Sequence, residues 1–83
     1  MSETYQSELT GKEYSLKNCV RIVNPLQCMF YWLSGLLPID IYPSNDFKSG
    51  KPILVFIYDR QESKKLYEKW CEHDVDWETL LND

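Results

Sequence analysis

The chain has 83 residues, enough for one domain with a modest core, and a composition of 43% hydrophobic and 27% charged residues argues against global disorder. Its net charge of −4 and its scattered Lys and Arg residues argue against a nucleic-acid backbone binder. The longest apolar run is too short to span a bilayer, and the first twenty residues lack the apolar core of a signal peptide. We therefore expect a cytoplasmic protein that binds neither membranes nor nucleic acid.

The polar start of the chain, residues 1–12, predicts either a flexible arm or an extra edge strand, and residues 13–83 are expected to form a single compact domain. A half-buried strand is expected to begin at Tyr14, because side chains alternate from there to Val23. The alternation places Tyr14, Val20 and Ile22 on one side, together with Leu16, and is interrupted by Asn18.

A helix start signal follows at Asn24-Pro25-Leu26-Gln27, which supplies an N-cap, a proline at the first helical position and a glutamine that can reach back to the cap. The helix is expected to run to about Ser34, with Gly35 as its left-handed C-terminal residue.

This first helix is apolar almost all round. We expect Leu26, Met29, Phe30 and Leu33 to face inward, which leaves Cys28, Tyr31 and Trp32 on the remaining arc. Two alternatives remain open for that arc. Either a second helix and the tail cover it, or it lies in an interface.

The rest of the chain predicts a short strand over 38–42, a loop over 43–51 and a strand over the unbroken apolar run 52–58. A second helix is expected from Asp59 to about His73, with an apolar stripe of Leu66, Tyr67, Trp70 and Cys71. The acidic tail predicts one more helical turn capped by Asp76, whose apolar residues Trp77, Leu80 and Leu81 tuck against the domain rather than form a docking motif.

These elements predict an α/β, two-layer α+β sandwich in the order β-α-β-β-α. Its sheet is expected to be three-stranded and mixed, with the apolar run in the centre, the first strand parallel to the second, and both helices on one face. One face of the central strand would then lack a cover. A patch of that size is more than soluble monomers usually expose.

No pattern of a catalytic, cofactor or metal site is present in the sequence. Cys71 and His73 form the only close pair of metal-binding types, and the three glycines stand apart, which excludes a phosphate loop. Cys19, Cys28 and Cys71 lack the spacing of a disulfide framework and are interpreted as reduced thiols. We expect a protein that is not an enzyme, with no cofactor.

Several short segments resemble a group of small uncharacterised α/β domains of Gram-positive bacteria and their phages. They are Ile22-Val23-Asn24-Pro25-Leu26-Gln27, Tyr31-x-x-x-Gly35-x-x-Pro38-Ile39-Asp40-Ile41-Tyr42, Val55-Phe56-Ile57 and Tyr67-x-x-Trp70. The resemblance covers about residues 14–74 and rests mostly on capping and core positions. It implies the compact strand–helix–strand–strand–helix fold and a mobile-element setting, and it implies no activity or cofactor.

The functional hypothesis is a non-enzymatic protein–protein interaction module that forms a homodimer and is phage-encoded, with a host bacterial protein as a further partner. Aromatic and apolar anchors concentrate binding energy, so we expect the contact residues to be Tyr31, Trp32 and the outward set of the central strand, Leu54, Phe56 and Tyr58. The alternative is an acidic inhibitor of the anti-defence type, which occupies the nucleic-acid-binding site of a host protein through the acids of its tail and second helix.

Overall fold

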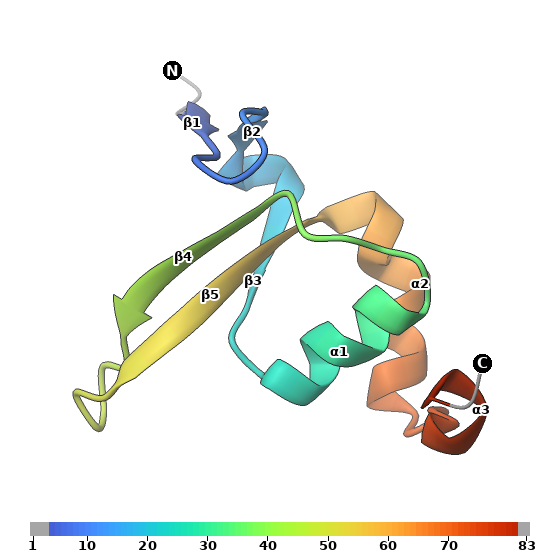
Figure 1. The fold of residues 1–83 in the computed structure, drawn as a ribbon. Helices are drawn as coiled ribbons and strands as arrows, with labels where there is room; N and C mark the ends of the chain where they lie inside the picture. The colour runs from blue at the N-terminus through green and yellow to red at the C-terminus, as the bar shows by residue number, and fades with distance from the viewer. Residues whose placement is uncertain (1–3, 82–83) are drawn as a thin grey trace.

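A computed structural model describes residues 4–81, which form a small mixed α/β fold with two sheets (Figure 1). The elements in chain order are β1 (Thr4–Gln6), β2 (Glu13–Ser15), the 3₁₀ turn η1 (Leu16–Asn18), β3 (Cys19–Ile22), α1 (Pro25–Leu33), β4 (Asp40–Asn45), β5 (Pro52–Asp59), α2 (Arg60–Cys71) and α3 (Trp77–Leu81).

The main sheet has the order β3-β5-β4, so the apolar run lies in its centre as predicted. Both edge strands pair antiparallel with β5. The expected mixed sheet is therefore wrong, because β3 and β4 are parallel only to each other and do not pair. Strand β4 also extends beyond the predicted end at Tyr42. Pro43 fits within it because an edge strand does not need every backbone N–H.

The expectation of a single sheet is also wrong, because β1 and β2 form a separate two-stranded sheet. Three side-chain hydrogen bonds tie this hairpin to the start of β4. The Ser7 and Tyr14 hydroxyls donate to the two carboxylate oxygens of Asp40 at 2.8 and 2.6 Å, and the Thr10 hydroxyl donates to the Ile39 carbonyl at 2.9 Å. Burial, and then the hydrogen bond to Asp40, raises the pKa of Tyr14. Residues 4–12 thus belong to a docked hairpin that ends at Ser15, and residues 1–3 of the predicted arm lie outside the described part.

Each face of β5 has its own buried cluster. Tyr58 belongs to the cluster on the helix side, and Phe56 packs against it, whereas Val55 and Ile57 lie on the opposite side with Tyr14 and other residues of the N-terminal half. The expectation that Leu54, Phe56 and Tyr58 form the outward set is therefore wrong, because α1 and α2 lie on that face.

The predicted strand from Tyr14 to Val23 is interrupted by η1. This turn changes which side of the sheet the chain presents. Tyr14 packs with Cys19 in the cluster on the hairpin side, whereas Val20 and Ile22 pack with the helices. The predicted alternation, which Asn18 interrupts, places Tyr14 on the same side as Val20 and Ile22. That prediction is wrong, because Tyr14 lies on the other side.

The helix ends follow the expected capping chemistry. The side chains of Asn24 and Asp59 accept hydrogen bonds from the first turns of α1 and α2. Helix α1 ends at a left-handed Gly35 (φ 97°), as predicted, and α2 ends in the same way at His73 (φ 58°). Gln27 does not reach back to the cap. Its amide instead donates to the Tyr31 hydroxyl at 3.0 Å.

Candidate functional site

Helix α1 packs with a different face inward from the predicted one. Its buried residues are Gln27, Cys28, Phe30 and Tyr31. The predicted inward stripe is therefore correct only for Phe30. Leu26, Met29, Trp32 and Leu33 are exposed, and we refer to these four residues as the α1 ridge.

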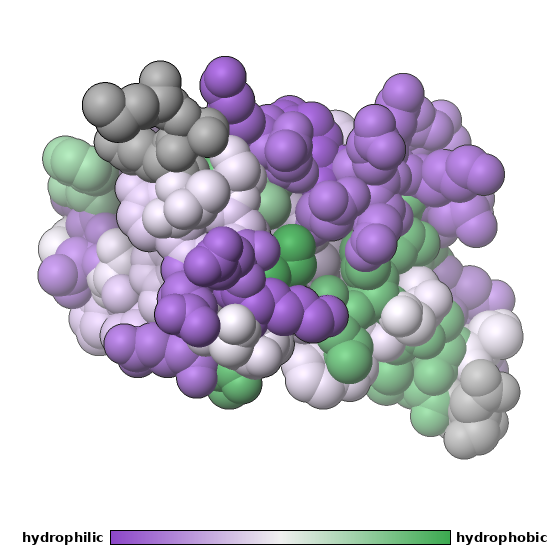
Figure 2. All heavy atoms as spheres, turned by 90° about the horizontal axis from the view of Figure 1, so that it is seen from above, coloured by the Kyte–Doolittle hydropathy of each residue, from purple (hydrophilic) through white to green (hydrophobic). Residues whose placement is uncertain are grey.

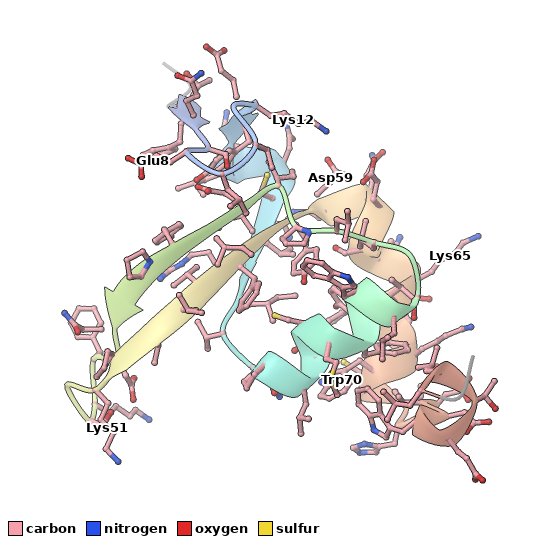
Figure 3. The ribbon with its side chains drawn as sticks, viewed as in Figure 1. Glu8, Lys12, Lys51, Asp59, Lys65 and Trp70 are labelled. Atoms are coloured by element: carbon pink, nitrogen blue, oxygen red, sulfur yellow. The ribbon has the colours of Figure 1, made fainter. Side chains whose placement is uncertain are left out.

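Aromatic packing explains this orientation. The ring of Tyr31 lies edge-on to that of Tyr58, with centroids 4.9 Å apart, and Phe30 stacks near Trp70 at 6.1 Å and meets Trp77 at 6.3 Å. Figure 3 shows Trp70 beside α1, toward the C-terminal end of α2. Large rings contribute most of the area that a small core can bury, and they set the rotation of α1 about its axis.

The predicted contact residues divide into two groups. Tyr31 and Tyr58 are fully buried, at 0% exposure each, so the expectation that they are available for contact is wrong for this chain on its own. Trp32 and Leu54 are exposed, at 54% and 52%, and Phe56 is partly buried against the helix-side cluster.

Two members of the second group, Trp32 and Phe56, meet at a shallow groove of about 290 Å³. Pro25, Cys28, Met29, Trp32, Leu33 and Phe56 line it. Leu54 lies on the same strand face as Phe56, two residues along β5, and so extends the apolar surface beyond the end of the groove. Figure 2 shows that hydrophobic residues gather in the half of the molecule that holds the helices and the C-terminal end.

The tail adopts the predicted helical turn, with Thr79 donating to Asp76 from both its backbone and its hydroxyl. Trp77 and Leu80 pack against the helix-side cluster, as expected, whereas Leu81 is exposed. The tail covers Phe30 but leaves the α1 ridge open. On the outer arc of α1, Tyr31 is covered within the cluster that it shares with Tyr58, whereas neither α2 nor the tail covers Trp32.

The thiols and the imidazole do not assemble into a reactive group. Cys28 is buried, and burial raises its pKa, which disfavours the nucleophilic thiolate. Burial likewise raises the pKa of Cys19, whereas Cys71 and His73 are exposed. Within residues 4–81, no group of three or more His, Cys, Asp or Glu side chains is placed to hold a metal ion.

The acids of α2 are interspersed with bases. Its exposed carboxylates Glu62 and Glu68 alternate along the helix with Lys64, Lys65 and Lys69. A mimic of nucleic acid needs a continuous negative surface, and α2 does not supply one. Across the described part of the chain, no helix is both long and apolar enough to cross a lipid bilayer.

No family model, no curated protein and no solved structure matches this chain. The site therefore rests on its own geometry. Sequence reasoning included Trp32, Leu54 and Phe56 and missed Leu26, Met29 and Leu33. The sequence did contain a signal for the buried face of α1, because Gln27 and Tyr31 are four residues apart and can hydrogen-bond to each other. Two polar groups that satisfy each other can be buried, which leaves the opposite face of the helix exposed.

Proposed function

We propose that this protein is a cytoplasmic, non-enzymatic interaction module that self-associates through the α1 ridge and the adjoining strand residues Leu54 and Phe56. The observation that carries the proposal is the exposure of Trp32 at 54% beside an apolar groove. Exposed tryptophans at the centre of apolar patches are typical anchors of protein–protein interfaces. The resemblance to bacterial and phage domains adds a host bacterial protein as a further candidate partner.

The shape of the surface favours a second copy of the chain as its occupant. A two-fold interface uses the same patch on both partners, so that patch must carry both a projection and a hollow. Here the ridge residues Met29, Trp32 and Leu33 form one wall of the groove between α1 and β5, and Leu26 is exposed next to them on α1. The ridge and the groove of one copy therefore form one apolar patch that is able to pack against the same patch of a second copy.

Light scattering coupled to gel filtration tests this proposal. We expect the wild-type protein at tens of micromolar to elute with the mass of a dimer. We expect Trp32→Glu to elute as a monomer with an unchanged circular dichroism spectrum, because Trp32 contributes little to the core of its own chain.

The matched control is Phe47→Glu. Phe47 is also an exposed aromatic residue, at 104%, but it lies in the loop between β4 and β5, away from the α1 ridge. This variant should remain dimeric. A monomeric wild type, or equal masses for wild type and Trp32→Glu, would show that the ridge does not join two copies.

A further inference from the structure

A second groove, of about 850 Å³, lies on the other flank of α1, along the free edge of β3. The first turns of α2 form its opposite wall. Within residues 4–81, strand β3 pairs only with β5, and alternate residues turn their backbone N–H and C=O groups to its outer edge. On that edge the Cys19 N–H and carbonyl already bond to Leu16 and Arg60, so the open backbone groups are those of Arg21. Such an edge is a template for one more strand.

The groove is basic, although the chain as a whole has a net charge of −4. Arg21, Arg60 and Lys64 line it, and no carboxylate is among the described residues that do so. Arg21 pairs with Ile57 and therefore lies on the hairpin-side face of β3. The other two cations come from α2 on the helix side, so positive charge borders both faces of the free edge. Arg60 and Lys64 are four residues apart and therefore share one side of α2.

Two polar groups at this groove are positioned for recognition. The Arg60 guanidinium donates to the Cys19 carbonyl at 3.1 Å, which holds it at the end of β3 and leaves other N–H donors of its fork available. Gln27 is buried, and its amide nitrogen is held by Tyr31 at 3.0 Å. Within residues 4–81 its carbonyl oxygen receives no hydrogen bond, so it is able to accept one from a ligand.

We propose that this groove binds an extended, acidic peptide segment of another protein, which adds to β3 as a fourth strand. Backbone hydrogen bonds to the β3 edge supply affinity, and carboxylates on either face of the peptide pair with Arg21, Arg60 and Lys64. This site is separate from the α1 ridge, because the two grooves lie on opposite flanks of α1 and are lined by different residues.

Selection of random nine-residue peptides displayed on phage against the immobilised full chain tests the proposal. We expect enriched sequences with acidic residues at adjacent positions as well as two apart, because successive side chains of an added strand point to opposite faces. We also expect a synthetic peptide of that sequence to shift the amide NMR signals of β3, Arg60 and Tyr67. Enrichment without acidic residues, no enrichment at all, or shifts confined to other elements would overturn the proposal.

Charge variants locate the site. We expect the double variant Arg21→Glu, Lys64→Glu to bind the selected peptide at least ten-fold more weakly than the wild type. The matched control is Lys12→Glu, Lys51→Glu, which makes the same change in charge at the hairpin and at the far end of the β4–β5 loop (Figure 3). This control should bind within two-fold of the wild type, and an equal loss in both double variants would exclude the β3 groove.

Two further ligands separate strand addition from simple charge attraction. The same peptide N-methylated at alternate residues keeps its charge but loses the donors that a sheet needs, so it should bind at least ten-fold more weakly. A nine-nucleotide oligothymidine should not compete. If either ligand binds as well as the selected peptide, the fourth-strand proposal is wrong. The Trp32→Glu variant should retain peptide binding, which makes this test independent of self-association.

Discussion

At the scale of single residues, Tyr58 has a buried hydroxyl that lacks a hydrogen-bond partner within the described part of the chain. The Cys28 thiol beside it is only a weak partner. Its neighbour Tyr31 is different, because that hydroxyl accepts from Gln27. The hydroxyl of Tyr58 therefore lowers the stability of the folded protein, whereas that of Tyr31 raises it. Single substitutions can measure the two contributions separately.

We expect Tyr58→Phe to raise the free energy of unfolding by about 1 kcal/mol, because it removes an unsatisfied polar group and keeps the ring. We expect Tyr31→Phe to lower it by about 1 kcal/mol, because the Gln27 amide loses its acceptor. Urea denaturation measures both changes. A Tyr58→Phe variant less stable than the wild type would mean that the hydroxyl is satisfied.

At the scale of elements, the hairpin of β1 and β2 depends on one carboxylate. Asp40 accepts from Ser7 and Tyr14, and within the hairpin the backbone bonds between Ser7, Gly11 and Lys12 close the turn. A two-stranded hairpin is marginal in water without other support. The docking at Asp40 therefore stabilises the hairpin as a unit.

We expect Asp40→Ala to destabilise the hairpin by about 1–3 kcal/mol, since two buried hydroxyls lose their acceptor. In hydrogen–deuterium exchange, the amides of Ser7 and Gly11 should lose protection, while those of α1 and α2 keep theirs. Asp46→Ala is the control, because Asp46 accepts from Ser49 in an exposed loop. Equal loss of protection across all elements would contradict a separately docked hairpin.

The sequence predicts where these elements occur better than it predicts which face of each element is buried. The cap residues Asn24 and Asp59 and the left-handed Gly35 are local signals, and each lies where the pattern places it. The rotation of α1 is not a local property. A helix that is apolar almost all round has no unique inward stripe, so distant rings such as Trp70 and Trp77 decide which arc is buried.

The interruption at η1 is a second example of a nonlocal choice. Asn18 interrupts the alternation, but the same alternation continues on both sides of it, so the pattern still places Tyr14 and Ile22 on one face. Of the candidate site, Trp32 could be predicted from its place on the outer arc. Tyr31 is adjacent to Trp32 in the sequence, but its contact with Tyr58 places it in the core instead of at the surface.

At the scale of the whole molecule, burial couples stability to alkaline pH. Burial is the main cause that raises the pKa of Tyr14, Tyr31 and Tyr58 above the ordinary value of 10.0. The unfolded chain therefore releases these protons at lower pH than the folded protein. This contribution to stability is fully present below pH 10 and is lost as pH rises above it.

We expect the free energy of unfolding to fall above about pH 9, where the buried thiols Cys19 and Cys28 begin to contribute, and to fall more steeply above pH 10. Urea denaturation at intervals between pH 7 and 11 measures this slope. The Tyr58→Phe variant should show a shallower slope than the wild type. A stability that is flat up to pH 11 would mean that these side chains are not shielded from water.

The position of β5 also determines when the chain can fold during synthesis. Strands β3 and β4 pair with β5 and not with each other, and β5 is the last of the three to be made. In a nascent chain that has not reached Asp59, β3 and β4 therefore lack their complete pairing partner, and α1 lacks the complete strand against which it packs. On the ribosome, the hydrophobic segments before Asp59 therefore remain exposed, and accessible to chaperones, until β5 has been synthesised.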